Sequence, residues 1–475
     1  MARRTKIVAT IGPASDDPAC LRTMIEAGVD VARVGLAHGP VEDSLARVAR
    51  IRTAAKDAGR IVGVMADLPG PKVRAGAFPD GGAFLAEGDT LSLRQGTGAS
   101  TATDIEVDHS SLLEGLVAGD RVALGDGGID LRVLDVDDVR ARAAVISGGR
   151  VQGRPGVVLP PAMLNFTTPT REDLRLLEAA VEAGVDMVAV SFVTKAEDMV
   201  AVRQAAAPAQ PFLIAKVETQ SAVDDLDAII DVSDGVMVAR GDLGVRLLLE
   251  DVPAIQKQII RTGVVYARPV ITATQMLESM VTAPAPTRAE VSDVYNAVHD
   301  GTSAVMLSGE TAIGHHPVAA VRWMDRIVER AERDFDHKAW GEQVGIAANT
   351  DETTERITGA LTSAAWRAAA DVGASAIVCA TRSGDTARAM ARFRPGVPLL
   401  AVTPSERTAA NLTLSWGTLP AVVAARETTD DIVWFAVEEA VARGLAKKGD
   451  VVAVLAGSPD DPEPATDVLR LVRVR

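Results

Sequence analysis

The sequence predicts an α/β fold, namely a (βα)8 barrel of the TIM type with an inserted β-barrel lid domain and a C-terminal three-layer α/β domain. Three observations support this prediction. Apolar β-branched runs alternate with stretches of helical periodicity, one long segment shows neither feature, and the alternation resumes near the carboxyl end. At roughly 150 residues per domain, a chain of 475 residues also favours about three domains.

Eight apolar runs are the expected strands of the barrel. Their hydrophobicity is continuous rather than alternating, which is typical of parallel strands covered by helices on both faces. The runs are 6–11, 29–36, 61–68, 185–193, 212–217, 235–239, 269–274 and 303–308. The stretches between them place apolar residues three and four apart, which predicts helices at 17–27, 41–57, 172–183, 224–231, 251–263 and 288–298. Eight strands that alternate with helices along the chain are typical of a (βα)8 barrel.

Residues 76–165 differ from the rest of the chain. Short segments such as 90–93, 121–124 and 129–133 lie between glycine-rich turns, which predicts a small β domain. It leaves the barrel after the third strand, at the end where barrels of this type carry their active sites. We therefore expect a lid that excludes water, with the barrel formed by 1–75 and 166–337.

The last predicted domain spans 338–475. It opens with a polar stretch, followed by a helix at 354–371 and a strand at 376–380. Further strands are expected at 399–402, 421–424, 451–455 and 468–474. This alternation predicts layered α/β structure.

The composition restricts the function classes. With 49 Lys+Arg against 64 Asp+Glu, the formal charge of −15 argues against nucleic-acid or membrane surfaces. No stretch approaches the ~20 apolar residues of a membrane span. The amino terminus lacks the apolar core of a secretion signal, and Cys20 and Cys379 lack metal or redox spacing. We therefore expect a cytoplasmic protein with reduced thiols.

Charged and hydroxyl side chains gather at the predicted carboxyl ends of the barrel strands. Glu218 and Asp242 end adjacent strands, so they can share one divalent cation, for which Mg²⁺ is the usual choice. The other members of this set are Arg33, His38, Asp67, Lys72, Arg74, Ser191, Lys195, Lys216, Thr274 and Ser308. A metal surrounded by cations, without a Cys or His nucleophile, indicates electrostatic catalysis of phosphoryl or enolate chemistry.

A simpler interpretation applies to each residue taken alone. A single Lys or Glu at a strand end is usually solvated or ion-paired, His38 is equally well explained as a structural histidine, and Thr274 or Ser308 can cap a helix. The coincidence on successive strands argues against this interpretation for Lys216 and its two carboxylate neighbours.

Several strings resemble the pyruvate kinase family, and the resemblance covers nearly the whole chain. They are RTKIVATIGPAS at 4–15, SFV at 191–193, MVARGDLG at 237–244, ATQMLESM at 273–280, PTRAE at 286–290 and MLSGETA at 306–312. The resemblance implies phosphoryl transfer from phosphoenolpyruvate to ADP in glycolysis, giving pyruvate and ATP, by a homotetramer.

The resemblance also implies roles for individual residues. Glu218 and Asp242 match the ligands of Mg²⁺, for which Mn²⁺ can substitute, and a second Mg²⁺ arrives with the nucleotide. Lys216, Arg33, Arg74 and Thr274 match residues that act on the transferring phosphoryl group or the enolate. Substrate contacts are implied for Lys216, Gly241, Asp242, Thr274 and Ser308, and nucleotide contacts for Arg33, His38 and Lys195.

The chain departs from the family pattern where many members bind K⁺. Gly35 and Ala37 stand in place of an Asn and a Ser, and Leu68 replaces the Thr after Asp67. Lys72 replaces a Glu of the K⁺-dependent members, so its ammonium group is expected to occupy the vacated charge position. The sequence thus predicts activity that does not require K⁺.

Other departures indicate a divergent member with slower turnover. Arg246 stands where the family usually has an acid, and 165–168 differs from the usual Leu-Pro-Ala-Leu. In the C-terminal domain, Thr381, Ser383, Gly384 and Thr386 open a predicted helix at 387–393, where the family binds sugar-phosphate activators. Free N–H groups at a helix start favour phosphate, but Asp385 adds a negative charge, so an ordinary helix cap is an equal alternative.

Two other functions remain open. A Mg²⁺-dependent pyruvate lyase or aldolase on the same barrel would share the metal-held enolate, without needing Lys195, Arg74 or a nucleotide. A catalytically weakened, metabolite-binding regulator would bind ligands without turnover.

Overall fold

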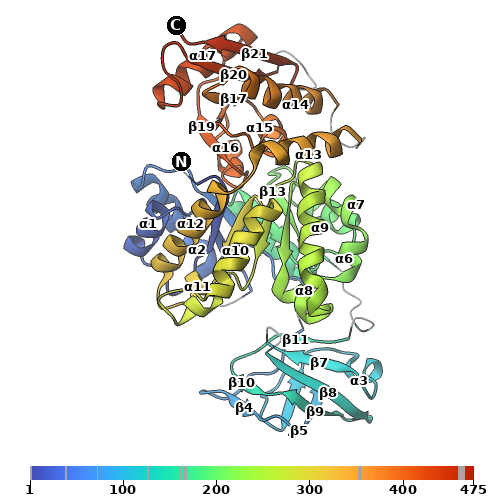
Figure 1. The fold of residues 1–475 in the computed structure, drawn as a ribbon. Coiled ribbons are helices and arrows are strands. Elements are labelled where there is room, and N and C mark those ends of the chain that lie inside the picture. The colour runs from blue at the N-terminus through green and yellow to red at the C-terminus, as the bar shows by residue number, and fades with distance from the viewer. Residues whose placement is uncertain are drawn as a thin grey trace.

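The computed structural model describes residues 3–37, 40–71, 73–125, 128–160, 163, 168–350, 356–457 and 466–475. Figure 1 shows a barrel in the middle of the molecule, a β domain at one end and an α/β domain at the other. No helix in the described part of the chain is both long and apolar enough to cross a membrane.

The barrel closes through eight parallel strands in the order β1-β16-β15-β14-β13-β12-β3-β2. They are β1 (Lys6–Thr10), β2 (Val31–Gly35), β3 (Gly63–Asp67), β12 (Met187–Val190), β13 (Phe212–Val217), β14 (Gly235–Ala239), β15 (Val270–Ala273) and β16 (Ala304–Leu307). Each predicted run contains one of these strands, so the (βα)8 prediction is confirmed. The strands are buried on both faces, which explains their continuous hydrophobicity.

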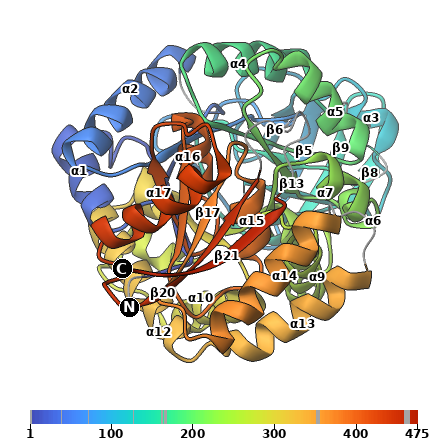
Figure 2. The ribbon, with the colours of Figure 1, turned by 90° about the horizontal axis from the view of Figure 1, so that it is seen from above.

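A ring of helices covers the strands (Figure 2). They are α1 (Pro18–Glu26), α2 (Val41–Asp57), α4 (Arg171–Glu182), α5 (Ala196–Ala205), α6 (Gln220–Asp224), α7 (Leu226–Val232), α8 (Arg240–Arg246), α9 (Val252–Val265), α10 (Arg288–Asp300), α11 (Gly309–Ala312) and α12 (Pro317–Arg333). Thr170 and Thr287 begin α4 and α10 with capping boxes. The prediction omitted α5, α6, α8, α11 and α12, although α12 buries residues three and four apart along its whole length.

The inserted domain is a nearly closed β barrel with a core of its own. Its six-stranded sheet has the order β11-β7-β8-β9-β5-β6, and β4 pairs with β10. The elements are β4 (Ala83–Leu85), β5 (Thr90–Gln95), β6 (Asp104–Val107), α3 (Leu112–Gly115), β7 (Arg121–Leu124), β8 (Ile129–Val136), β9 (Ala141–Ser147), β10 (Gly149–Val151) and β11 (Val157–Val158). Its buried apolar cluster shares no residue with the main barrel cluster.

The C-terminal domain is a five-stranded sheet in the order β19-β18-β17-β20-β21, with β21 antiparallel. Ile377 and Cys379 cluster with residues of α14 and α15, whereas Val378 between them clusters with residues of α17. Two helical layers therefore enclose the sheet, as predicted. The elements are α13 (His337–Thr350), α14 (Arg356–Asp371), β17 (Ala376–Ala380), α15 (Asp385–Ala391), β18 (Leu399–Thr403), α16 (Glu406–Leu412), β19 (Thr418–Val422), α17 (Thr429–Ala442), β20 (Val451–Ala456) and β21 (Val468–Arg473).

Two local predictions in this domain were wrong. The polar stretch expected to open it is mostly helix α13, because Trp340 and Val344 pack into the main core and give this segment a buried side. Strand β19 begins three residues before the predicted 421, since Pro420 is tolerated at the edge of the sheet. The domain limits at 75, 165 and 337 stay predictions.

Candidate active site

The predicted site residues lie where the barrel strands end. Lys216 is near the end of β13, Glu218 follows that strand, and Asp67 ends β3. Asp242 lies in the first turn of α8, directly after β14. Because β13 and β14 are hydrogen-bonded neighbours, the two carboxylates predicted to share a metal do come from adjacent strands.

Lys216 is the centre of this arrangement. Its Nζ lies 3.2 Å from Asp67 Oδ1 and 2.9 Å from Glu218 Oε1, and it donates a 2.6 Å hydrogen bond to Ser191 Oγ. The lysine side chain is 12% exposed. Burial by itself lowers the pKa of Lys216, but the carboxylates of Asp67, Glu218 and Asp242 outweigh it and hold that pKa above its ordinary value. The ammonium group is therefore charged at neutral pH.

Arg33 and Lys216 meet on the same carboxylate. Arg33 Nε lies 2.7 Å from Asp67 Oδ2, and its Nη1 donates to Thr10 Oγ1 over 3.0 Å. Burial raises the pKa of Asp67, but Arg33 and Lys216 outweigh that effect and lower it. Asp67 is thus an ionised anchor that fixes two cations at the strand ends.

Glu218 is a buried carboxylate whose lost hydration is only partly replaced by contacts with Lys216 and the Phe192 backbone. Its Oε2 accepts a 2.8 Å hydrogen bond from the Phe192 backbone N–H, and its side chain is 1% exposed. Burial raises the pKa of Glu218, Lys216 opposes this change, and Asp242 raises it further. Two mutually repelling carboxylates at a strand end fit a hard divalent cation, which would relieve the repulsion.

The protein supplies few ligands for such a metal. No group of three or more His, Cys, Asp or Glu side chains with suitable geometry occurs in the described residues. One or two carboxylates, with substrate oxygens and water completing the shell, is the usual environment of Mg²⁺. The donor set present here fits that pattern.

Thr274 lies in a strained loop after β15. Its φ of 67° and the φ of 53° at Gln275 fall in the left-handed region, which is rare for residues with a Cβ. The Thr274 hydroxyl accepts a 2.7 Å hydrogen bond from the Gly241 N–H and donates to the Ala273 carbonyl. A Cβ on Gly241 would lie 3.3 Å from that hydroxyl. The strain persists because neighbouring contacts hold it.

Arg240 supplies most of those contacts. Its Nη2 donates to the Thr274 carbonyl over 2.8 Å, and its Nε donates to the Ala273 carbonyl over 3.2 Å. Asp293 of α10 holds the guanidinium in place through a 2.7 Å contact to Nη1. The sequence placed the backbone of residues 240–242 at the site but missed the role of this side chain, whose only signal was its position inside MVARGDLG.

Ser308 and Glu310 follow β16, the eighth strand of the barrel, and Glu310 belongs to α11. The buried Glu310 accepts hydrogen bonds from the N–H groups of Ser308 and Leu277, over 2.6 Å and 3.0 Å. Ser308 Oγ is buried and has no hydrogen-bond partner among the described residues. It does not cap α11, so the helix-cap interpretation does not hold for Ser308. Glu310 was missed as an organiser of this turn.

The remaining predicted residues lie further from Lys216 or outside the described residues. Arg74 donates to the carbonyl oxygens of Arg154 and Ala37, each over 3.2 Å, and thus joins the lid to the loop after β2. Lys195 is exposed at the start of α5. His38 and Lys72 lie outside the described residues, so the structure tests neither prediction.

Arg246 contributes positive charge beside the carboxylates. Its guanidinium lies 4.9 Å from the centre of the Phe192 ring, in cation–π range. Burial lowers the pKa of Arg246, whereas Asp242 and Glu218 raise it. The substitution noted in the sequence therefore places a cation near both candidate metal ligands.

The loop 381–386 forms part of a separate hollow in the C-terminal domain. Gly384 has a φ of 95° and begins α15, and its N–H donates to Thr381 Oγ1 over 2.9 Å. Ser383 Oγ bonds the Asp385 carboxylate at 2.5 Å, and the Thr386 and Thr466 hydroxyls lie 2.6 Å apart. Arg382 and Arg426 also line the hollow, which is open to solvent and, together with the solvent at its mouth, spans about 920 Å³.

Comparisons with known proteins agree along the chain. A family model described as "Pyruvate kinase, barrel domain" matches residues 2–321, and one described as "Pyruvate kinase, alpha/beta domain" matches residues 359–472. A pyruvate kinase of Methylorubrum extorquens is 40% identical over 473 residues, which cover 100% of this chain and 98% of the relative.

Two further relatives show the same extent of similarity. A pyruvate kinase of Agrobacterium vitis is 41% identical over 472 residues, covering 99% of this chain and 98% of the relative. A pyruvate kinase of Mycobacterium tuberculosis is 39% identical over 478 residues, covering 100% of this chain and 99% of the relative. The similarity thus spans the barrel, the inserted domain and the C-terminal domain together.

Proposed function

The chain belongs to the pyruvate kinase family, and on this premise we propose how its residues carry out the reaction. It is a phosphotransferase of glycolysis that moves the phosphoryl group of phosphoenolpyruvate to ADP, giving pyruvate and ATP. The observation that carries the proposal is the contact of Lys216 with Asp67, Glu218 and Ser191 at the strand ends.

Lys216 is assigned to the transferring phosphoryl group and the enolate oxygen. In the transition state, negative charge spreads over the phosphoryl oxygens, and a fixed ammonium group stabilises it without reorganisation. Asp67 and Ser191 orient that ammonium group, so the charge is placed before substrate arrives. Arg33, fixed on Asp67, adds a second cation for phosphate.

Glu218 and Asp242 are assigned to the metal. Members of this family are typically dependent on a divalent metal, and we propose Mg²⁺ here, with Mn²⁺ as a substitute. When bound, the metal neutralises phosphoryl and carboxylate oxygens as a Lewis acid. The Phe192 N–H and Lys216 hold Glu218 in position for it.

The backbone of residues 240–242 and the Thr274 hydroxyl are assigned to the substrate carboxylate. Gly241 fits because its lack of a Cβ leaves room beside Thr274. Thr274 also serves the enolate carbon that takes a proton. Ser308, at the neighbouring strand end, offers a hydroxyl that has no hydrogen-bond partner in the described part of the chain. Arg74, His38 and Lys195 are assigned to phosphate and nucleotide contacts.

Activity without K⁺ is the second part of the proposal. Gly35 and Ala37 offer no side-chain oxygen, and Asp67 already binds two cations. Lys72 is assigned the vacated charge position, and Arg246 adds positive charge beside Glu218 and Asp242. Turnover measured with Na⁺ replacing K⁺ should stay within about two-fold, and a strong K⁺ requirement would refute this part.

Regulation and assembly complete the proposal. The loop with Thr381, Ser383, Gly384 and Thr386 is assigned to a sugar-phosphate effector, the chain to a homotetramer, and the location to the cytoplasm. A coupled assay of pyruvate formation, with and without candidate sugar phosphates, tests the effector assignment. Light scattering tests the oligomeric state.

One assay separates the main function from its two alternatives. ATP formed stoichiometrically with pyruvate from ADP and phosphoenolpyruvate supports the kinase. A lyase or aldolase would release pyruvate without ATP, and a regulator would bind phosphoenolpyruvate without turnover. Either result would overturn the assignment of these residues to phosphoryl transfer.

A further inference from the structure

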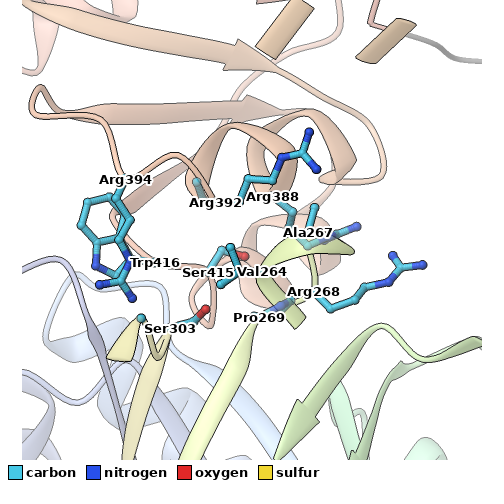
Figure 3. Close-up of a pocket in the computed structure, with 12 residues that line it drawn as sticks. Val264, Ala267, Arg268, Pro269, Ser303, Arg388, Arg392, Arg394, Ser415 and Trp416 are labelled. Atoms are coloured by element: carbon cyan, nitrogen blue, oxygen red, sulfur yellow. The ribbon is translucent and has the colours of Figure 1, made fainter. Parts of the chain in front are cut away.

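A second cavity lies in the seam between the barrel and the C-terminal domain (Figure 3). Its barrel wall comes from the end of α9 and the start of β15, and its other wall from α15 and the segments before β18 and β19. It is partly open to solvent, and the space between its walls, together with solvent at its mouth, amounts to about 330 Å³. None of the residues assigned to phosphoryl transfer lines it.

The described residues that line this cavity carry positive charge and no negative charge. Arg268, Arg388, Arg392 and Arg394 belong to the lining, and no Asp or Glu does. Figure 3 places Arg394 and Trp416 at one end and Arg268 at the other, with Ser415 between them. Arg388 Nη2 lies 2.7 Å from Oδ1 of Asp385, a residue that does not line the cavity.

Several donors on these residues are buried and unused. Among the described residues, Arg268 Nε, Arg388 Nε and Nη1, Ser415 Oγ and Trp416 Nε1 have no hydrogen-bond partner. Arg388 is 8% exposed, Ser415 2% and Trp416 3%. Buried donors without acceptors are rare in folded proteins because their lost hydration is not replaced.

The charge is also incompletely balanced. Burial lowers the pKa of Arg394 to about 9, with only Glu332 opposing the change. Burial and the neighbouring Arg388 lower the pKa of Arg268, against the opposing effect of Asp234, Asp385 and Asp231. The lowered pKa values of Arg268 and Arg394 mean that burial disfavours their charged forms. A bound negative charge would stabilise those charged forms.

We propose that this cavity binds a phosphate-type oxyanion, either free or as the terminal group of a small metabolite. Such an ion supplies several acceptor oxygens to the unused donors and negative charge to the arginines, a geometry that guanidinium groups match well. Water would satisfy the donors but leave the charge uncompensated. This site is distinct from the hollow at residues 381–386, which lies at the other end of α15.

The bound ion would join the two domains. The Arg388 guanidinium lies 5.3 Å from the centre of the Phe212 ring, and Phe212 begins β13, the strand that carries Lys216. Arg392 Nη1 donates to the Val265 carbonyl at the end of α9 over 3.0 Å. An ion bound here would therefore contact α15 on one side and lie near the starts of β13 and β15 on the other. The opposite ends of these strands carry Lys216 and Thr274.

The test measures inorganic phosphate binding by isothermal titration calorimetry at constant ionic strength. Lys216→Met serves as the background, because it weakens phosphate binding at the strand ends. We expect saturable binding that becomes about ten-fold weaker or more when Arg268→Met is added. Arg22→Met is the matched control, since it removes an exposed arginine of α1 that lines neither this cavity nor the hollow at residues 381–386, and it should leave the affinity unchanged.

Clear results would overturn the proposal. The proposal is wrong if binding is not saturable, if affinity is equal with and without Arg268→Met, or if Arg22→Met abolishes binding. Ser415→Ala, which removes one hydroxyl without changing charge, provides a second variant should Arg268→Met not fold, and it should also weaken binding. A parallel titration with glycerol phosphate separates the two sources, since a metabolite site binds the ester at least as tightly as the free ion.

Discussion

Lys216 illustrates how much a single position can reveal. Its place at a strand end, together with Glu218 and Asp242 on successive strands, predicted contact with a charged substrate. The structure adds Asp67 and Ser191, which lie on other strands and orient the ammonium group. The result is a cation fixed before substrate binds, which is the condition for effective electrostatic catalysis.

Replacement of Lys216 by methionine tests this role. Methionine retains the aliphatic stem but removes the charge, so we expect pyruvate formation to fall by about 10²–10³-fold or more, with the circular dichroism spectrum retained. Lys216→Arg should recover part of the activity, because it restores a cation near Asp67. Near-normal turnover in Lys216→Met would contradict the assignment.

Arg240 is a positioning residue that acts through Thr274. It holds the left-handed loop after β15 by two carbonyl contacts, and Asp293 holds Arg240 in turn. A left-handed conformation at a β-branched residue costs about 1–2 kcal/mol. Without Asp293 the loop is free to relax, and the Thr274 hydroxyl loses its place beside Gly241.

Asp293→Asn tests this chain of contacts. We expect kcat to fall and KM for phosphoenolpyruvate to rise, by about ten-fold each, while KM for ADP stays near its original value. The matched control is Asp334→Asn, which breaks the Arg330–Asp334 ion pair on the surface and should leave both constants unchanged. An equal rise in both KM values would indicate a general structural effect.

Helix α13 is the element that joins the barrel to the C-terminal domain. The Trp340 indole N–H donates to the Arg392 carbonyl over 2.8 Å, and His337 Nδ1 lies 2.9 Å from the Arg394 carbonyl. Burial lowers the pKa of His337, and the nearby Arg4 and Arg394 lower it further, whereas the Arg394 carbonyl and Glu332 oppose this change. The start of α13 is therefore a titratable part of the seam.

This lowered pKa predicts how stability varies with pH. The unfolded protein binds protons at His337 more readily than the folded protein does. The contribution of neutral His337 to the free energy of unfolding is therefore fully present above the ordinary pKa of 6.5, and it is lost as the pH falls toward the lowered pKa. Urea unfolding between about pH 5 and pH 8 measures it. His337→Gln should flatten this dependence, whereas the exposed His315→Gln should not.

The whole molecule combines three parts, with the inserted β domain at one end of the barrel and the C-terminal domain at the other (Figure 1). The lid has its own core, and the two chain segments that lead into and out of it meet at the barrel, since the Gly70 N–H donates to Asp173 Oδ1 over 2.9 Å. Arg74 links the lid to the loop after β2. The inserted domain thus has a core of its own and leaves the barrel after β3, and its placement over the site stays a prediction.

Excision of residues 76–165 tests this separation. With a short Gly-Ser linker in their place, we expect the barrel and C-terminal domain to unfold cooperatively, because their cores share no residue with the lid core. Turnover should fall by about 10²-fold or more, since Arg74 loses its lid contact and water enters the site. Thermal unfolding and the coupled assay measure the two effects, and full activity would contradict a lid function.

Local patterns predicted the barrel strands well and some helices poorly. A strand that is buried on both faces consists of consecutive apolar residues, so β13 and β14 can be predicted without tertiary information. Helix α8 is short and contains Gly241 and Gly244, and α13 is polar on its exposed side. Both are stabilised by contacts with the barrel rather than by their own periodicity.

The amino-acid order alone was enough to establish the barrel, the interrupting lid and the strand ends at which Lys216, Glu218 and Asp242 lie. It did not specify that Asp67 would bind Lys216, because these residues are 149 positions apart and share no local pattern. The arginine-lined seam cavity and the Arg240–Asp293 contact likewise exist only after distant segments pack. Local composition encodes burial, whereas the pairing of charges depends on which strands and helices become neighbours.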